Sequence, residues 1–419
     1  MKVLWITNIV MPEAAALLKG ESVHRISGGW LIGAADNLVF QSDVSLYIAS
    51  ISKDVSELAC LKGEKITYYL IPFGKGNTRI NHDYERYWHL VEEAIKPDVV
   101  HIHGTEFTHG LAYLEACGCK NVCVSIQGLV SACCYYYYYG LSLREIRKSV
   151  TPYSLLVGGI LKGYNDFSRR GEAEKEIIRR VNHIIGRTSW DKERIWAINP
   201  KATYHFGGET LRSEFYTNII WKYENCTPHS IFYSQASYPI KGLHMLLRAM
   251  PLVLRHFPDA KIRIAGNDIT CSKGGKSLLR LTDYGQIVRK LIKGLELKDC
   301  VTFTGSLDAV EMRQEYLKSN VFVCASSIEN SPNSLGEAQI LGVPVIASYV
   351  GGIPDMMEGD ERHLYRFEEI EMLAYKLCQL FAEESRIDTS HMRQLALLRH
   401  NPERNARELM TVYKTISHD

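Results

Sequence analysis

Two glutamates in the last quarter of the chain lie on either side of a short polar turn. Seven residues, Asn-Ser-Pro-Asn-Ser-Leu-Gly, separate Glu329 from Glu337, and an apolar helical stretch follows. Pro332 disfavours helical geometry at the residue before it, which predicts that Glu329 lies on a loop and Glu337 on a helix beginning just after the proline. The free N–H groups and the positive dipole end of that helix can bind a phosphate. The flanking carboxylates could then accept hydrogen bonds from sugar hydroxyl groups.

A lysine and a glycine pair offer further groups for an anion. Lys241 stands at a predicted helix start, where its charge opposes the helix dipole unless an anion lies nearby. Gly28 and Gly29 also precede a helical stretch, and glycines there let backbone N–H groups approach a phosphate closely. They lack the Gly-x-Gly-x-x-Gly spacing of a dinucleotide fingerprint, which argues against an NAD enzyme. A solvated lysine and an ordinary Gly-Gly turn are the alternatives.

Polar side chains also mark two strand ends in the first half of the chain. His101 and His103 lie two apart on one strand-like run, so they share a face, and His103 is at its carboxyl end, where α/β sheets bind ligands. No third ligand stands at metal-site spacing, so we expect one structural and one cleft-lining histidine. Gln127 takes the same position one strand later. It can orient a substrate by hydrogen bonding but cannot act as a base.

The elements that must position these groups alternate along the whole chain. Nearly continuous apolar runs separated by amphipathic stretches predict an α/β fold with two parallel sheets covered on both faces. We expect domains at residues 1–220 and 221–400, followed by a C-terminal helix at 401–419. The predicted strands are 3–7, 44–48, 99–103, 122–126, 183–185, 231–234, 262–265, 301–304, 321–324, 343–347 and 364–367.

Composition limits the class of protein. The 419 residues are 46% hydrophobic and 23% charged with a net charge of +2, which suggests two globular domains and no nucleic-acid partner. Eleven cysteines without Cys-x-x-Cys pairing predict reduced thiols and a cytoplasmic location. The first apolar run is too brief for a secretory signal, and the run 153–161 is too short to span a bilayer. Any membrane contact, at the inner face of the membrane, is therefore expected to be peripheral.

A run of five tyrosines, Tyr135 to Tyr139, precedes Arg144, Arg147 and Lys148. Aromatic and basic residues together suit a lipid headgroup surface or a bulky acceptor. The alternative, which we favour from the sequence, is a helical hairpin packed on the first sheet with half-buried tyrosines.

Together these motifs resemble the retaining family-4 glycosyltransferases. The resemblance spans nearly the whole chain and is most specific between Ser326 and Pro354. It implies the GT-B fold: two Rossmann-like domains facing a cleft, with the C-terminal helix crossing back to the first domain. The motifs that carry it are Ser27-Gly-Gly-Trp30, Val99-Val-His-Ile-His-Gly104, Lys241-Gly242, Glu329 with Glu337, and Gly342-Val-Pro-Val-Ile-Ala-Ser348 followed by Gly351-Gly352.

The resemblance also implies roles for residues. The second domain would hold a UDP- or GDP-sugar donor, and the first would present a glycan or lipid-linked acceptor. Glu337 would bind the ribose, and Glu329 the donor sugar. Because the chain has no Asp-x-Asp triplet, we expect no metal and no cofactor; backbone amides, helix ends and Lys241 would meet the phosphate charge. The remaining donor contacts would come from Asn330, Ser331, Pro332 and Asn333 for the sugar, Gly28 and Gly29 for the diphosphate, and Gly305, Ser306 and Leu307 for the base.

Two positions depart from the family pattern. Gln235 stands where members often have an arginine that adds a cation at the diphosphate, and Gln127 stands where many have a histidine. A mechanism that needs a histidine at the second position requires His103 to substitute. The run Ser125-Ile-Gln-Gly-Leu129 resembles enzymes that build bacterial surface polysaccharides.

The sequence therefore predicts a retaining hexosyl- or N-acetylhexosaminyl-transferase, with Glu329, Lys241, His103 and Gln127 as the candidate catalytic residues. Two alternatives stay open at this point. Gln127 and Gln235 would also fit a GT-B-like protein that binds nucleotide-sugars without transferring them, and an epimerase could use the same fold.

Overall fold

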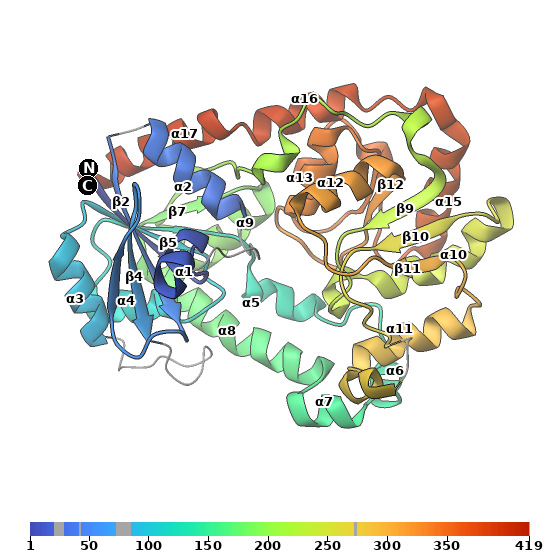
Figure 1. Cartoon of the computed structure of the whole chain (residues 1–419), viewed down its shortest axis with the longest axis horizontal. Helices are drawn as coiled ribbons and strands as arrows, with labels where there is room; N and C mark the ends of the chain where they lie inside the picture. Colours follow the sequence, from blue (N-terminus) through green and yellow to red (C-terminus); the bar gives the residue numbers. More distant parts are fainter. Residues whose placement is uncertain (21–28, 42, 73–84, 272–274, 419) are drawn as a thin grey trace. The chain divides into compact units, whose positions relative to one another are not determined.

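The computed structural model describes residues 1–20, 29–41, 43–72, 85–271 and 275–418 (Figure 1). They form two compact units. Unit 1 comprises Met1–Ala132, Asp166–Arg212 and Arg399–Asp419, and unit 2 comprises Cys133–Asn165 and Ser213–Leu398. Each unit is built around one sheet of its own, which confirms the predicted α/β fold with two sheets.

Unit 1 holds an eight-stranded sheet in the order β3-β4-β2-β1-β5-β6-β7-β8, parallel except for β3. Strands β3, β4 and β8 were not predicted from the sequence. Strands β3 and β8 lie at the sheet edges with side chains partly exposed, so they lack the continuous apolar run of a doubly covered strand. The strands are β1 (Lys2–Thr7), β2 (Ser45–Ser52), β3 (Ala59–Lys62), β4 (Thr67–Pro72), β5 (Val99–His103), β6 (Val122–Ser125), β7 (His183–Gly186) and β8 (Thr203–Phe206).

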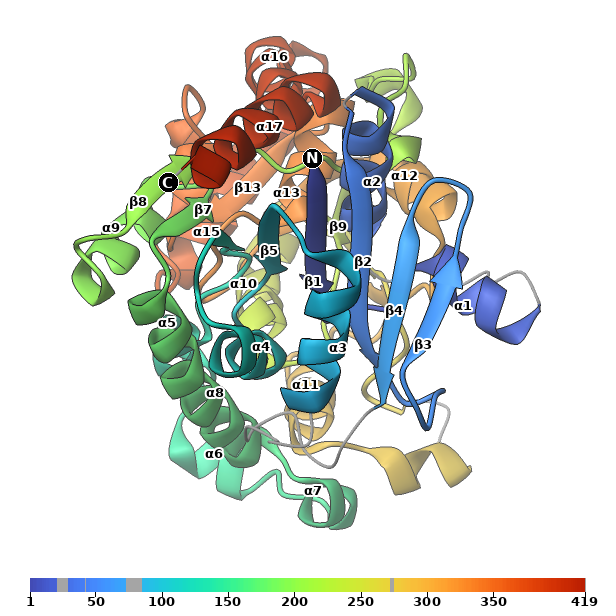
Figure 2. The same ribbon diagram turned by 90° about the vertical axis from the view of Figure 1, so that its left-hand side faces the viewer.

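Alternate residues of β1 belong to two cores on opposite faces of this sheet. Figure 2 shows the sheet with its helices. Leu4 and Ile6 pack with α3 (Glu85–Ile95), α4 (His109–Cys117), α8 (Ile160–Arg180) and α9 (Ser189–Ile198). Val3 and Trp5 pack with α1 (Pro12–Lys19), α2 (Gly29–Gln41) and the C-terminal helix α17 (Pro402–His418). The Trp5 indole N–H donates to the Tyr413 hydroxyl at 2.8 Å, so the predicted return of the last helix to the first domain is confirmed.

Unit 2 holds a six-stranded parallel sheet in the order β11-β10-β9-β12-β13-β14. The chain runs from β9 to β10 and β11 on one side, then returns to β12 on the other side of β9. At such a reversal the loops after neighbouring strands diverge and leave a crevice at the carboxyl ends of the strands. The strands are β9 (Thr227–Tyr233), β10 (Lys261–Ile264), β11 (Val301–Phe303), β12 (Ser319–Cys324), β13 (Val345–Ser348) and β14 (Leu364–Tyr365).

The helices of unit 2 cover both faces of its sheet. The larger core joins β9, β10 and β12 to α10, α11 and α15. No helix in the parts of the chain described above has the length and apolar character needed to cross a membrane. The helices are α10 (Leu243–His256), α11 (Asp283–Gly294), α12 (Ala309–Lys318), α13 (Asn333–Leu341), α14 (Ile353–Met356), α15 (Ile370–Glu383) and α16 (Ser390–Arg399), with the short 3-10 helix η6 (Gly275–Arg280) before α11.

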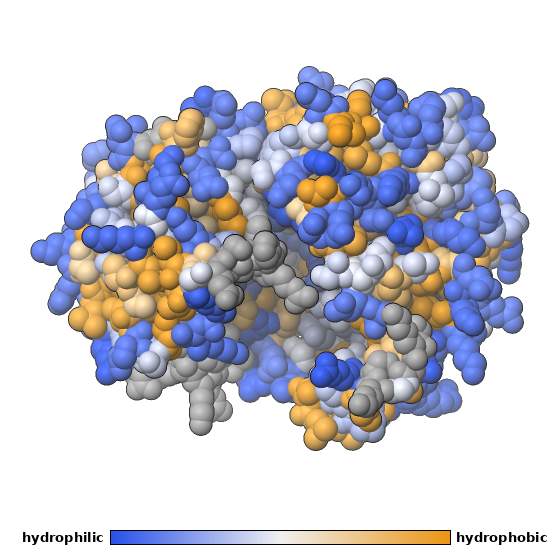
Figure 3. Space-filling model, in the orientation of Figure 1, coloured by the Kyte–Doolittle hydropathy of each residue, from blue (hydrophilic) through white to orange (hydrophobic). Residues whose placement is uncertain are grey.

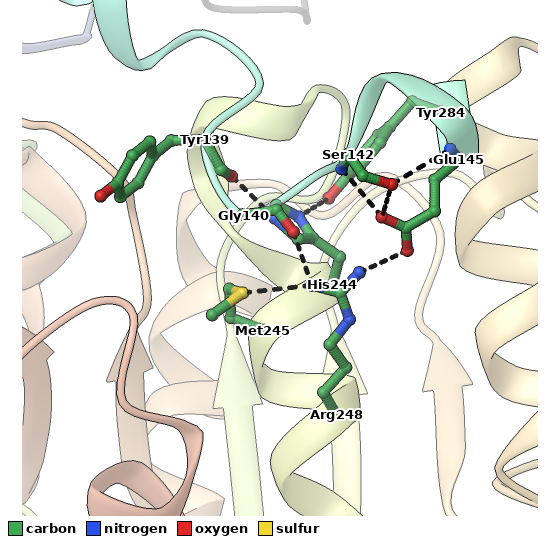
Figure 4. A network of polar contacts seen from close by, with 8 residues as sticks. All are labelled: Tyr139, Gly140, Ser142, Glu145, His244, Met245, Arg248 and Tyr284. Atoms are coloured by element: carbon green, nitrogen blue, oxygen red, sulfur yellow. Dashed lines mark hydrogen bonds and ion pairs between the residues drawn. The ribbon is translucent and has the colours of Figure 1, made fainter. Parts of the chain in front are cut away.

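The tyrosine run and the hairpin after it belong to unit 2, so the expectation that they pack on the first sheet is wrong. The hairpin carries α6 (Leu143–Arg147) and α7 (Pro152–Val157). The Arg248 guanidinium on α10 donates to the Gly140 carbonyl and to the Glu145 carboxylate, both at 2.6 Å (Figure 4). Tyr137 and Tyr138 pack against the core of unit 2. Polar contacts and aromatic burial together fix this segment on α10.

His244 is a second anchor of the hairpin (Figure 4). Its Nε2 lies 3.0 Å from the Tyr139 carbonyl oxygen, which only accepts, so Nε2 carries the proton and donates. Nδ1 is then free to accept from the Tyr284 hydroxyl at 3.3 Å. Burial, aided by the charge of Arg248, lowers the pKa of His244 to about 3. The native contact therefore requires the neutral imidazole.

This anchor predicts sensitivity to acid. The pKa of His244 is about 3 in the folded chain against 6.5 as its ordinary value, so the unfolded chain takes up the proton first as pH falls. The stability from His244 is full above about pH 6.5 and decreases below it, by roughly 2 kcal/mol at pH 5. His244→Gln keeps an N–H donor for Tyr139 without titrating. We expect it to show a smaller fall in Tm between pH 7 and pH 5 than the parent chain.

The matched control is His89→Gln, which changes an exposed histidine on α3. It should leave the pH dependence of Tm unchanged. An equal fall in Tm for the parent chain and His244→Gln would contradict the role given to this histidine.

Candidate active site

The loops that follow β9 and β12 meet through an ion pair. Lys241 Nζ lies 2.6 Å from Glu329 Oε1, and the two side chains are only 20% and 14% exposed. The Ser326 hydroxyl donates to the same oxygen at 2.7 Å. Within the described residues Glu329 Oε2 makes no hydrogen bond, so one carboxylate oxygen is left to accept from a ligand hydroxyl.

The ion pair holds Lys241 in its charged form. Burial alone would lower the pKa of Lys241, but the charge of Glu329 and the hydrogen bond to it outweigh burial and raise the pKa above its ordinary value. The ammonium group is therefore protonated at neutral pH. It supplies a fixed positive charge at the crevice of unit 2, where an anionic ligand would be stabilised.

Two glycines let the backbones of these loops approach closely. Gly242 has φ 76°, and a Cβ there would lie 1.7 Å from the Ala325 carbonyl oxygen. Gly351, after β13, has φ 53°, and a Cβ there would lie 1.9 Å from the Glu329 carbonyl oxygen, which also accepts from Gly352 N–H at 3.0 Å. Since only glycine fits either position, the Gly351-Gly352 pair fixes the backbone that carries Glu329.

The polar turn after Glu329 has the predicted form. Helix α13 begins at Asn333, directly after Pro332. Glu337 lies one turn along it and is buried. Asn333 Oδ1 is buried and finds no hydrogen-bond partner in the part of the chain that the structure covers. Pro332 and Asn330 are also buried, whereas Ser331 is half-buried between them.

The other donor-side residues follow strands of the same sheet. Gln235 is exposed two residues beyond β9, and Gly305, Ser306 and Leu307 come shortly after β11. Gly305 and Gly266 form a backbone bridge in which Gly266 N–H donates to Gly305 oxygen at 2.9 Å. The structure thus brings Lys241 and Glu329 into contact and places the other positions at loops on the carboxyl edge of the sheet. Gly28 lies outside the described residues, and Gly29 opens α2 in unit 1.

Residues 227–383, which lie within unit 2, match the family model described as glycosyl transferases group 1. This part of the chain is therefore similar to the group 1 glycosyl transferases. Spore coat protein SA of Bacillus subtilis (strain 168) is 26% identical over 180 residues, which are 42% of this chain and 46% of that protein. D-inositol 3-phosphate glycosyltransferase of Corynebacterium urealyticum is 26% identical over 179 residues, 42% of this chain and 41% of that protein. Each alignment spans less than half of the relative's length.

Solved structures of low sequence identity share the fold of nearly the whole chain. Sucrose-phosphate synthase from Thermosynechococcus elongatus has a TM-score of 0.69 at 15% identity, covering 99% of this chain and 98% of that one. Anabaena HepE, solved with UDP and glucose, has a TM-score of 0.62 at 13% identity and covers 99% of this chain and 100% of that one. The predicted GT-B fold is thereby confirmed. The individual roles of the site residues stay predictions.

In unit 1, His103 is a buried, neutral histidine at the end of β5. Its ring stacks on His101 at 3.8 Å, and burial, with His101 and Arg187 nearby, lowers its pKa well below the ordinary value. Neither ring nitrogen has a hydrogen-bond partner among the residues described. His103, Trp30 and Arg187 help to line a cavity of about 60 Å³. A cavity of that size can hold water beside His103.

His101 is instead the structural member of the pair. Its Nδ1 is hydrogen-bonded to the Tyr413 hydroxyl at 2.6 Å, and its Nε2 to the Ser125 hydroxyl. Burial lowers its pKa to about 3. The expectation of one structural histidine therefore fits the contacts of His101, while the cleft-lining role of His103 stays a prediction.

Glu106 and Glu174 hold the loop that carries Gln127, and neither was found from the sequence. Gly128 N–H donates to Glu106 at 3.1 Å. Glu174 accepts from Ser131 N–H at 2.9 Å, Val130 N–H at 3.1 Å, and the hydroxyls of Ser131 and Thr105. Both glutamates are far in sequence from the loop, so no local pattern signals the contacts. They fix the backbone that follows Gln127.

The close approach at Gly351 yields a prediction for the loop that carries Glu329. Gly351→Ala places a methyl group against the Glu329 carbonyl and forces an alanine into left-handed geometry, which costs about 1–2 kcal/mol before any clash. We expect a lower Tm and the loss of the stabilisation that an added nucleotide gives. The control is Gly294→Ala on α11, where a Cβ meets nothing within 4 Å. Unaltered nucleotide stabilisation in Gly351→Ala would rule out the positioning role of this glycine.

The contacts of Glu174 yield a prediction for unit 1. Glu174→Gln replaces one acceptor oxygen by an NH₂ group that must face a backbone N–H, and an unpaired buried donor costs about 1–3 kcal/mol. We expect a clear fall in Tm, measured by thermal unfolding. Glu172→Gln, an exposed change on the same helix, is the control. Equal Tm values for the two variants would show that Glu174 does not hold the loop.

Proposed function

We propose that this chain transfers a sugar from a nucleoside diphosphate donor to a glycan or lipid-linked acceptor with retention of configuration. The proposal rests on the contact between Lys241 and Glu329, on the loops after β9 and β12. Both residues lie within the region that matches the group 1 family. A protonated lysine and a carboxylate with one unused oxygen offer complementary groups to a phosphate and a sugar hydroxyl.

In the proposed reaction the donor's own phosphate accepts the proton, and protein groups around it stabilise its charge. The bond between sugar C1 and the β-phosphate oxygen breaks, the acceptor hydroxyl forms a bond to C1 on the same face, and its proton passes to the departing phosphate oxygen. Lys241 stabilises the charge on that oxygen, and Glu329 positions the sugar. Glu337 accepts from the ribose hydroxyls. Electrostatic support of a developing charge usually contributes more to such catalysis than any other single effect.

Relatives support a nucleotide-sugar donor. One relative is a GDP-mannose-dependent mannosyltransferase of Mycolicibacterium smegmatis, and one similar structure, a trehalose-6-phosphate protein from E. coli, is bound with UDP-2-fluoro glucose. We infer a UDP- or GDP-hexose or N-acetylhexosamine for this chain. The likeness of the Gln127 loop to enzymes of bacterial surface polysaccharide synthesis suggests a growing glycan as the acceptor. His103 and Gln127, which present neutral hydrogen-bonding groups, would orient it.

Three substitutions test the assignment. We expect Lys241→Ala and Glu329→Ala each to reduce transfer by about 100-fold because charge support or sugar positioning is lost. Glu337→Ala should weaken nucleotide binding about tenfold, as expected for losing a charged hydrogen-bond partner. Sugar transfer is measured with a panel of nucleotide-sugars and acceptor extracts, and nucleotide binding by calorimetry.

The control is Arg263→Ala, which removes another ion pair of unit 2, between β10 and α12, with Arg263 Nε 2.6 Å from Glu315. Undiminished transfer in all three site variants would refute the proposal. Donor binding without transfer to any acceptor would indicate a GT-B-like binding protein. Conversion of the donor without an acceptor would indicate an epimerase.

A further inference from the structure

The hairpin on unit 2 exposes a group of leucines at its tip. On α7, Leu155 and Leu156 are 76% and 85% exposed, and Leu279 on η6 is 75% exposed. Helix α7 lies against η6, and we call these three residues the leucine tip. Figure 3 shows apolar side chains gathered at the edge of unit 2 where Figure 1 draws α7. A cluster of large apolar side chains on a surface marks an interaction site more often than single exposed leucines do.

Polar contacts hold the tip in this exposed position. The side chains of Thr151 and Ser154 form a capping box at the start of α7, and the Thr151 hydroxyl donates to the Leu281 carbonyl at 2.5 Å. On the other side of α7, Ile160 N–H donates to the buried Asp283 carboxylate at 2.7 Å. The residues before and after α7 are thus fixed to Leu281 and to Asp283 at the start of α11. This keeps Leu155 and Leu156 from folding back onto the core.

Exposed basic side chains outnumber acidic ones on the segments that carry and adjoin the tip. Lys162 follows α7 and donates to the Val157 carbonyl at 2.9 Å. Within residues 142–165 and 275–294, only two side chains are acidic. Glu145 is paired with Arg248, and Asp283 is buried and hydrogen-bonded, so neither offsets the surface charge. The exposed basic side chains on these segments are Arg144, Arg147, Lys148, Lys162, Arg280, Arg289, Lys290 and Lys293.

From this arrangement we infer that the leucine tip docks on an anionic lipid surface. Leucines inserted at the headgroup level and a surrounding set of Lys and Arg side chains are the two complementary parts of peripheral membrane binding. A second copy of the chain fits less well. A symmetric contact would bring the same patch onto itself and set like charges against each other.

The inference goes beyond the proposed sugar transfer, because it concerns where the protein works. Membrane docking would bring the chain to a lipid-linked acceptor. It does not depend on the contacts of Lys241 or Glu329, so the two proposals can fail separately.

The test is co-sedimentation of the full chain with vesicles. We expect binding to vesicles of equal parts phosphatidylglycerol and phosphatidylcholine, weaker binding at high salt, and little binding to phosphatidylcholine alone. Leu155→Ser with Leu156→Ser should weaken binding by about tenfold or more. The matched control is Leu90→Ser with Leu398→Ser, which changes two leucines of 50% and 51% exposure on α3 and α16. Equal Tm values for parent and tip variant would show that the variant folds.

Three results would overturn the inference. They are no binding of the parent chain to anionic vesicles, equal binding by the parent and the tip variant, and self-association that the tip variant abolishes. The last result would assign the tip to a second copy. Loss of vesicle binding in the tip variant, with unchanged transfer to a water-soluble acceptor, would support the inference and leave the transfer proposal intact.

Discussion

The contact between Lys241 and Glu329 depends on a constraint in the backbone rather than on the side chains alone. These residues are 88 positions apart, and the order of the parallel strands brings their loops to one crevice. The 2.6 Å contact then requires the loops to approach more closely than a Cβ would allow at Gly242 and Gly351. The two glycines and the strand order together determine where the charged groups of Lys241 and Glu329 lie.

Local signals explain what the sequence could predict. Most strands covered on both faces were found from their continuous apolar runs, and Pro332 marked the start of α13. The buried strand β4 was missed. The edge strands β3 and β8 were also missed, since partial exposure removes that run. The packing of the hairpin was also mispredicted, because its anchors are more than 100 residues away: Arg248 is 108 positions from Gly140 and His244 is 105 from Tyr139. Nothing in the hairpin itself indicates which sheet it joins.

The two units present different kinds of polar group at their strand ends. In unit 2 an acidic partner raises the pKa of Lys241 and preserves a full charge. In unit 1 burial lowers the pKa of His101 to about 3 and that of His103 well below its ordinary value, which leaves neutral rings. A charged side chain suits the binding of a diphosphate. Neutral donors and acceptors suit hydroxyl groups, because a hydrogen bond to a hydroxyl does not offset the free-energy cost of removing an ion from water. This division is consistent with a donor on one unit and an acceptor on the other.

The segment that leads into the hairpin also contacts the loop that carries Glu329. The Ser327 hydroxyl, next to Ser326 on the loop after β12, donates to the Tyr136 carbonyl at 2.8 Å. Tyr136 opens the segment whose next residues are held by His244 and Arg248. A chain of short polar contacts therefore runs from the hairpin to the residues beside Glu329. The start of the hairpin and the backbone beside Glu329 are positioned together by this connection.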